Sequence, residues 1–283
     1  MSTIDTRSDA PFETLRFEQT GHVASVVLNR PDKLNSFTPK MWAELRALGR
    51  ALVADPGDVR ALVVRGEGRA FSSGIDTSVF GEGLSAEALG EDGPLRHEDA
   101  KVAAILTAQD SYTWLAEAPF VTIAAVRGFA LGAGLQLAIA CDIRVVARGA
   151  QLGLLEHKYG ILPDLGGTQR LPRIVGIGKA IELITTAAKI DADEALRIGL
   201  VEQVVSDEEL DAVADALAAR IAAQPPLAVQ GAKRAVHAAL DGRSVRDGLV
   251  IEAEGQAVCL SSADFTEAIT AFIEGRPPEY RGR

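Results

Sequence analysis

Three short apolar runs set the strongest limit on how this chain can fold. They are too short for buried helices and lie at residues 60–65 (RALVVR), 120–126 (FVTIAAV) and 143–147 (IRVVA). Continuous apolar runs of this length are typical of strands that are buried on both faces of a sheet. Helical periodicity lies between them, over residues 97–118 and 132–140. The pattern strand, strand, helix recurs irregularly and predicts an α/β fold in which helices cover buried sheets.

The two ends of the chain follow simpler patterns. Residues 15–20 and 22–28 are β-rich runs that meet at Gly21, which predicts a hairpin. Thr38 before Pro39 predicts a helix start, because threonine caps helices and proline suits the first turn. After Val205, four helical segments follow one another: 207–223, 226–240, 245–260 and 263–273. We therefore predict a core over residues 13–205, and an all-helical region over 206–283 that packs on the core or mediates assembly.

Charge and composition exclude several classes of function. The 283 residues carry a formal net charge of −10 and no Lys/Arg cluster that would follow a phosphate backbone, so we expect no nucleic-acid partner. There is no apolar signal segment, and no apolar stretch approaches the length of a membrane span, so we expect no membrane partner. Cys141 and Cys259 are too few for a disulfide framework or a zinc site. These features predict a cytoplasmic protein without a metal.

Three glycine-bearing stretches are the candidates for chemistry. They are 66–76 (GEGRAFSSGID), 127–146 (RGFALGAGLQLAIACDIRVV) and 154–171 (LLEHKYGILPDLGGTQRL). The third glycine of GxGxxG is missing after Gly134 and no GxxxxGK[ST] occurs, so neither nucleotide-binding fingerprint is present. Gly132 and Gly134 either permit close helix–strand packing or expose a backbone N–H at a helix start. Such an N–H stabilises a developing oxyanion by about 3–4 kcal/mol in a dry site.

Together these stretches resemble the crotonase superfamily, the enoyl-CoA hydratase/isomerase group. The resemblance lies in RAFSSGID, GFALGAGLQLAIACDIRV and the E-x7-D-x-G-G-T-Q-R-L run, with LNRPDKLNSF and AFIEGRPPEY similar to the family's early and closing segments. It implies a crotonase-like spiral of strand–strand–helix turns with a C-terminal all-helical region, assembled as a homotrimer or a dimer of trimers. It also implies an acyl-CoA substrate and no cofactor, because coenzyme A is part of the substrate.

The resemblance further implies roles for individual residues. The backbone N–H groups of Ser73 and Ala133 would hold the thioester oxygen as an enolate forms. The substrate would lie along residues near these donors: Lys33, Leu34, Ser73, Gly74, Ile75, Asp76 and Gly132. Residues 78–116 would line the acyl-chain pocket. Basic residues near the C-terminus could meet the CoA phosphates, and the choice stays open among Arg276, Arg281 and Arg283.

The family's hydratases use two glutamates, and the corresponding positions here hold Gln136 and Glu156. An amide neither takes nor gives a proton at neutral pH, although it can orient a water. The apolar neighbours Leu154, Leu155 and Ile161 predict a raised pKa for Glu156, which suits an acid/base. The alternative is that Glu156 is a surface charge at the end of a strand.

The sequence leaves two interpretations of Asp164 equally open. It is either a second proton-transfer group, as in dienoyl-CoA isomerases of the superfamily, or the cap of a helix over GGTQRL. On an extended strand, His157 would face away from its neighbour Glu156, which makes it structural. Cys141 is expected to be a small buried residue rather than a nucleophile, and His237 has no partner in sequence.

The sequence thus predicts an acyl-CoA enzyme that works through a thioester enolate, with Glu156 as the acid/base. Because Gln136 replaces an acid, double-bond isomerisation of an enoyl- or dienoyl-CoA is slightly favoured over hydration. The alternatives are a hydratase with Glu156 as the sole acid/base, another CoA-thioester lyase or hydrolase, and a weakly catalytic acyl-CoA-binding protein.

Overall fold

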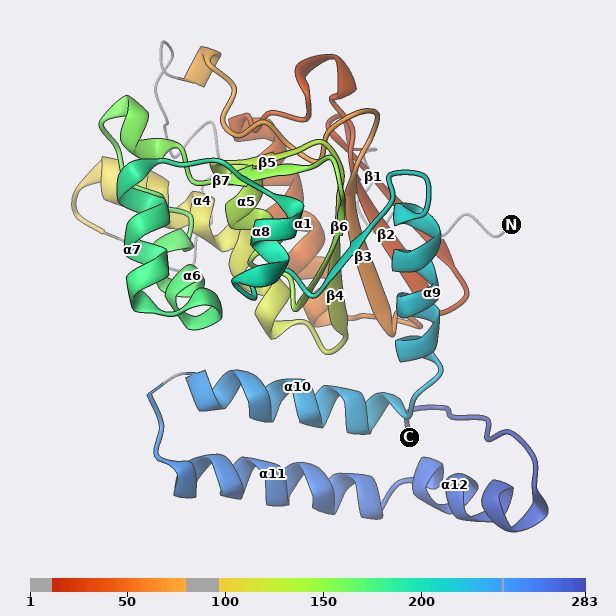
Figure 1. The fold of residues 1–283 in the computed structure, drawn as a ribbon. Coiled ribbons are helices and arrows are strands. Elements are labelled where there is room, and N and C mark those ends of the chain that lie inside the picture. The colour runs from red at the N-terminus through yellow and green to blue at the C-terminus, as the bar shows by residue number, and fades with distance from the viewer. Residues whose placement is uncertain (1–11, 80–96, 241) are drawn as a thin grey trace.

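The centre of the molecule is a six-stranded sheet in the order β1-β2-β3-β4-β6-β9 (Figure 1). The computed structural model describes residues 12–79, 97–240 and 242–283, so residues 80–96 of the predicted acyl-chain pocket lie outside it. The strands are β1 (Leu15–Thr20), β2 (Val23–Leu28), β3 (Ala61–Gly66), β4 (Val121–Val126), β6 (Ile143–Ala147) and β9 (Gln203–Val205). β1 and β2 form the predicted antiparallel hairpin, and the other neighbours are parallel. Parallel neighbours require crossovers, which carry the helices.

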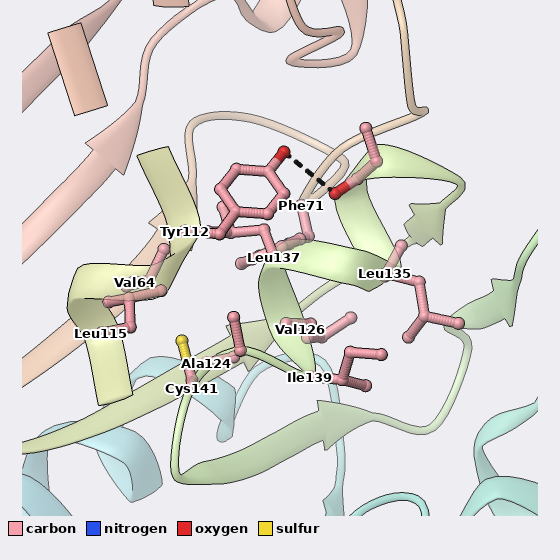
Figure 2. Close-up of a cluster of buried hydrophobic side chains, with 14 of the residues drawn as sticks. Val64, Phe71, Tyr112, Leu115, Ala124, Val126, Leu135, Leu137, Ile139 and Cys141 are labelled. Carbon is pink, nitrogen blue, oxygen red and sulfur yellow. Dashed lines mark hydrogen bonds between the residues drawn. The ribbon is translucent and has the colours of Figure 1, made fainter. Parts of the chain in front are cut away.

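One face of this sheet is covered by α1 (Pro39–Ala54), α4 (Ala100–Glu117) and α5 (Ala133–Ala138). The Thr38 hydroxyl accepts a hydrogen bond from the Met41 N–H at 3.3 Å, so the predicted helix start is confirmed. Figure 2 shows apolar side chains of α4 and α5, among them Leu115 and Leu137, meeting β3 and β4 in this core. The prediction of three sheet strands with covering helices is therefore confirmed.

A second, three-stranded sheet was not predicted. It contains β5 (Phe129–Leu131), β7 (Gln151–Gly153) and β8 (Ile190–Asp191), in that order. These strands are too short to show a period in sequence. Together with α5 they give the chain the repeated strand–strand–helix turns of the predicted spiral. Further elements follow β7: the 3-10 helix η2 (Glu156–Tyr159), α6 (Gly167–Val175), α7 (Ile177–Thr186) and α8 (Ala192–Arg197).

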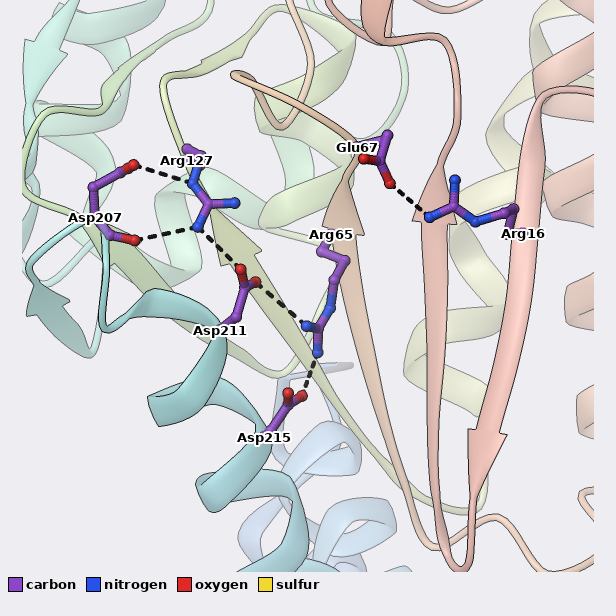
Figure 3. Close-up of polar contacts among 7 residues, drawn as sticks. All are labelled: Arg16, Arg65, Glu67, Arg127, Asp207, Asp211 and Asp215. Carbon is purple, nitrogen blue, oxygen red and sulfur yellow. Dashed lines mark hydrogen bonds and ion pairs between the residues drawn. The ribbon is translucent and has the colours of Figure 1, made fainter. Parts of the chain in front are cut away.

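The opposite face of the large sheet is covered by α9 (Leu210–Ala222). Its buried positions recur every four residues, at Leu210, Ala214, Ala218 and Ala222, and the small side chains bring the helix close to the sheet. Arg65 and Arg127 flank Asp211 of α9 at 3.3 and 3.0 Å, and Arg65 also pairs with Asp215 (Figure 3). The first helix after residue 206 is thus fastened to the sheet, and the predicted division at that residue stays a prediction.

The last three helices, α10 (Pro226–Leu240), α11 (Val245–Leu260) and α12 (Ala263–Glu274), lie below this core in Figure 1. Buried Lys233 fastens α10 to the core, because its ammonium donates to the carbonyls of Leu115 and Phe120 at 2.6 and 2.9 Å and pairs with Asp142 at 2.9 Å. His237 also meets Asp142, at 2.8 Å. None of the helices in the described ranges is both long and apolar enough to cross a membrane.

Candidate active site

Two backbone turns meet at the carboxyl ends of β3 and β4. Ser72 and Ala130 form a β-bridge that places the turn after Ser72 beside the turn after β5. Gly74 and Gly132 have φ of 105° and 51°, values that other residues adopt with strain. A methyl group on Gly74 would lie 3.0 Å from the Leu131 carbonyl oxygen and 3.9 Å from the Ala133 nitrogen. The structure therefore brings together the two stretches that the resemblance assigned to the oxyanion.

The N–H of Ala133 is free to bind an oxyanion. Ala133 is the first residue of α5, and within the described residues its N–H has no acceptor, as expected for a helix start. The buried hydroxyl of Tyr112 donates to the Ala133 carbonyl at 3.2 Å, the bond drawn in Figure 2. The Trp42 indole N–H donates to the same hydroxyl at 3.2 Å. This chain of hydrogen bonds fixes the peptide group between Ala133 and Gly134, which directly follows the peptide group of the Ala133 N–H.

The prediction that the Ser73 N–H is the second donor to the oxyanion is wrong. Its N–H donates to the Leu34 carbonyl at 2.9 Å and is therefore occupied. Two positions later, the parallel bridge between Phe37 and Ile75 uses the Gly74 carbonyl and the Asp76 N–H, which leaves the Ile75 N–H directed away from Phe37. Among the described residues, the Ile75 N–H has no acceptor. Sequence alone could not show this, because the register of an isolated bridge leaves no pattern.

Glu156 is buried and has two unlike carboxylate oxygens. It begins η2 and is 5% exposed. Its Oε1 accepts a hydrogen bond from the Gln136 amide at 2.8 Å, whereas its buried Oε2 has no partner in the described part of the chain. Burial raises the pKa of Glu156, the Gln136 hydrogen bond opposes the shift, and the charge of Asp164 adds to it. The alternative of a surface charge is wrong.

Two details around Glu156 differ from expectation. Leu154 is buried as predicted, but Ile161 is 41% exposed and is not part of a closed apolar pocket. Residues 156–159 form a 3-10 helix rather than a strand, so strand alternation does not explain why His157 points elsewhere. His157 is exposed, which leaves no role for it beside Glu156.

Gln136 joins Glu156 to the start of α6. It is 1% exposed, and its side-chain oxygen accepts hydrogen bonds from the N–H groups of Leu165 and Gly167 at 2.7 and 2.9 Å. With the bond to Glu156, three of its four hydrogen-bonding positions are used within the protein. A single N–H is left for a water.

Asp164 does not cap α6. Gly166 precedes that helix in a left-handed conformation, and no side chain accepts from its first turn, so the capping alternative is wrong. Asp164 is half-buried, and burial raises the pKa of its carboxyl. Its own carbonyl accepts from Gln109 at 2.5 Å. Asp164 lines a cavity of about 760 Å³ between α4, α6 and α10 that Glu156 does not line.

The residues predicted to hold the substrate lie together. Exposed Lys33 and its neighbour Leu34 lie beside Ser73 because of the bond between Leu34 and Ser73 described above. Asp76 holds this arrangement, since it pairs with Arg30 at 2.9 Å and accepts from Ser36 at 3.1 Å. Although burial opposes ionisation, hydrogen bonds from Ser78, Arg30 and Ser36 lower the pKa of Asp76 to about 2. Asp76 is therefore a fixed structural anion.

The C-terminal arginines lie away from this site in one chain. Arg60, at the amino end of β3, donates to the Tyr280 carbonyl at 2.9 Å, whereas the two turns lie at the carboxyl ends of the strands. Arg276 is already paired with Glu267 and Glu274. Within one chain, these arginines are therefore not placed to contact the substrate phosphates.

Cys141 behaves as predicted for a structural thiol. It is buried, and burial raises its pKa to about 12, so the reactive thiolate does not form at neutral pH. His237 gains a partner that sequence did not indicate, the Asp142 carboxylate at 2.8 Å. Their separation of 95 residues leaves no local motif by which the pair could be found.

Comparisons with known proteins identify the family of the chain. The profile of the family described as enoyl-CoA hydratase/isomerase matches residues 18–283. Crotonyl-CoA hydratase of Syntrophomonas wolfei is 37% identical over 270 residues, which cover 95% of this chain and 98% of that protein. Short-chain-enoyl-CoA hydratase of Clostridium acetobutylicum is 38% identical and covers 93% of this chain and 95% of its own length.

Solved structures give the same result. Enoyl-CoA hydratase of Bacillus anthracis superposes with a TM-score of 0.84 at 33% identity, covering 96% of this chain and 100% of that one. A Thermobifida fusca protein crystallised in complex with CoA is 40% identical, with a TM-score of 0.78 and coverage of 88% and 93%. The chain therefore belongs to the enoyl-CoA hydratase/isomerase family of the crotonase superfamily.

Proposed function

We propose that the protein hydrates a 2-enoyl-CoA, with Glu156 as the acid/base and the N–H groups of Ile75 and Ala133 as donors to the enolate oxygen. One observation carries the proposal: beside the turn that presents the Ala133 N–H, Glu156 keeps a buried oxygen with no partner among the residues that the structure describes. A methyl group on Gly132 would lie 3.4 Å from Glu156 Oε1, so the carboxyl lies next to this turn. The CoA complex of the Thermobifida fusca relative supports a CoA thioester as substrate.

The proposed reaction needs one carboxylate and one water. The ionised Glu156 removes a proton from water as the water oxygen attacks the β-carbon, and the thioester oxygen becomes an enolate. The two backbone N–H groups bind that oxygen, and each donor of this kind contributes about 3–4 kcal/mol to the transition state. The protonated Glu156 then returns its proton to the α-carbon. The sum is addition of one water across the double bond, with no cofactor consumed, since coenzyme A belongs to the substrate.

The raised pKa of Glu156 suits both steps. A general base works best when its pKa approaches the operating pH, because it must be ionised in one step and give up its proton in the next. Burial raises the pKa of Glu156 from its usual value toward neutral pH. Gln136 has no proton to exchange, so Glu156 performs both transfers.

The sequence favoured isomerisation, but the names of the relatives support hydration better. Isomerisation stays a second candidate because of one observation. The half-buried carboxyl of Asp164 has a raised pKa and interacts electrostatically with Glu156, so two acids are available for moving a proton between carbons.

Incubation with 2-enoyl-, 3-enoyl- and dienoyl-CoA, followed by product analysis, tests the proposal. We expect 3-hydroxyacyl-CoA from the 2-enoyl substrate. An interconversion of double-bond isomers without hydroxyacyl product would instead support the second candidate. Binding of every thioester without turnover would support an acyl-CoA-binding protein, and the absence of binding would contradict all of these functions.

Large apolar side chains on α7 and on the last three helices support assembly into trimers. They are exposed by more than half in the single chain: Ile177, Ile181, Val236, Val245, Leu249, Val250, Val258, Leu260, Phe272 and Ile273. Exposed apolar groups on this scale mark an interaction surface, and a second copy of the chain is the occupant that we propose. Light scattering should give three or six times the chain mass of 29.8 kDa. A monomer at micromolar concentration would contradict this.

A further inference from the structure

The side chain of Gln136 has its orientation fixed from both ends. Its oxygen accepts from two backbone N–H groups, those of Leu165 and Gly167, and its nitrogen donates to Glu156. A flipped amide would place its NH2 against two N–H donors and its oxygen against a carboxylate oxygen. All three contacts would then be repulsive, so only one orientation fits.

This orientation makes the two oxygens of Glu156 different. Oε1 accepts the amide N–H at 2.8 Å, whereas Oε2 is buried with no partner among the described residues. In a protonated carboxyl group the carbonyl oxygen is the better acceptor, so the amide holds the carbonyl character on Oε1. The proton then belongs on Oε2.

We propose that Gln136 is a positioning residue that fixes Glu156 Oε1 as a permanent acceptor, so that Oε2 alone receives the proton from water and returns it to carbon. The inference rests on the proposed function for the identity of the reaction. The assignment of the oxygens rests only on the hydrogen bonds of Gln136. It differs from a role in orienting water, because the amide is bonded to the base itself.

Among the side chains around Glu156 in the described structure, only Gln136 favours its ionised form, alongside the backbone N–H of Glu156 itself. Asp164, on the loop before α6, adds negative charge, and Tyr112, on α4, stays neutral because burial raises its pKa well above its usual value. Arg170 of α6 donates to the Leu165 carbonyl at 3.0 Å, next to one of the N–H groups that hold Gln136. The amide is the only side chain in the described structure that donates to the Glu156 carboxylate.

Replacement of Gln136 with methionine tests the proposal. Methionine has a similar length but no hydrogen-bonding amide, so the ionised form of Glu156 loses its donor. We expect the pKa of Glu156 to rise by about one unit, and the acidic limb of the kcat–pH profile to move by the same amount. The pKa is measured by 13C NMR of protein labelled at the glutamate Cδ, with the Glu156 signal assigned by its loss in Glu156→Gln.

A second variant acts on the same amide without changing it. A methyl group on Gly167 would lie 2.9 Å from the Gln136 oxygen, so Gly167→Ala forces the amide out of its present position and weakens its bond to Glu156. We expect a smaller pKa shift in the same direction as Gln136→Met. Gln169→Met, at an exposed position on α6, is the matched control and should leave the Glu156 signal unchanged.

Gln136→Glu tests whether the side chain at position 136 contacts the Glu156 carboxyl in solution. The new carboxylate still accepts from the two backbone N–H groups, and its other oxygen faces Glu156. The two carboxyls should then titrate in two well-separated steps as a pair that shares one proton. An unchanged Glu156 titration in Gln136→Met, or two independent titrations in Gln136→Glu, would overturn the proposal. The NMR titration needs no turnover, so it can hold even where the hydration assay fails.

Discussion

Glu156→Gln should lower turnover of the 2-enoyl substrate by about 10²–10⁴-fold, the usual contribution of a positioned acid/base. Glutamine has nearly the same shape and can keep the contact with Gln136, but it cannot accept a proton from water. Substrate binding should change little, because the thioester oxygen is held by backbone N–H groups. Steady-state kinetics and the dissociation constant of a saturated acyl-CoA separate the two effects.

The same substitution should stabilise the fold at neutral pH. Burial raises the pKa of Glu156 in the folded protein, so folding favours the protonated form. Its favourable contribution is complete below the unfolded pKa of about 4.3 and is lost as the pH rises through the raised folded value. A neutral glutamine avoids this loss, so thermal unfolding should show a higher Tm for Glu156→Gln at neutral pH and a smaller difference in acid.

Glu208→Gln serves as the control for this experiment, since Glu208 is exposed on the loop before α9. It should change neither turnover nor the pH dependence of Tm. Undiminished turnover in Glu156→Gln would show that the base lies elsewhere. A Tm difference that is the same at every pH would contradict the raised pKa.

Ala133→Pro should lower kcat by about 10²–10³-fold, the effect of removing one oxyanion donor. Proline has no N–H, and the first turn of a helix tolerates it because that N–H has no acceptor within the helix. Ala133 is the first residue of α5, so the variant removes the donor with little change to the helix. Kinetics with the same 2-enoyl substrate, alongside circular dichroism and thermal unfolding, measure both effects.

Ala133→Gly is the control, because it changes the same residue but keeps the N–H. We expect it to retain most of the activity. Equal losses in the two variants, both with intact folds, would mean that the Ala133 N–H does not bind the developing oxyanion.

The parts of the fold that were predicted correctly have strong local signals. Thr38 and Pro39 form a start signal that acts within one helical turn, and Gly21 separates two clear β-runs. β5 and β7 were missed because three residues cannot show a period, and their pairing joins segments about twenty residues apart. The glycine at 134 is explained by packing, since a methyl group there would lie 2.7 Å from the Ser72 Cβ.

The candidate site was predicted in part. Glu156 could be identified from its motif, and its burial in the structure agrees with the raised pKa that its neighbours predicted. Two other assignments depended on tertiary hydrogen bonds that leave no trace in sequence. Ser73 uses its N–H on Leu34, and Gln136 uses its amide on Glu156 rather than on a water alone. To assign these two residues correctly, one must know which of their atoms already have hydrogen-bond partners in the folded chain.

Hydration of a 2-enoyl-CoA in D2O tests the central claim most directly. If Glu156 alone takes the proton from water and returns it to the α-carbon, both parts of the water molecule are added from its side of the substrate. NMR and mass spectrometry of the product should then show one deuterium at the α-carbon, on the same face as the new β-hydroxyl. Addition to opposite faces would require a second acid and would contradict the account, as would formation of the hydroxyacyl product at an undiminished rate in Glu156→Gln.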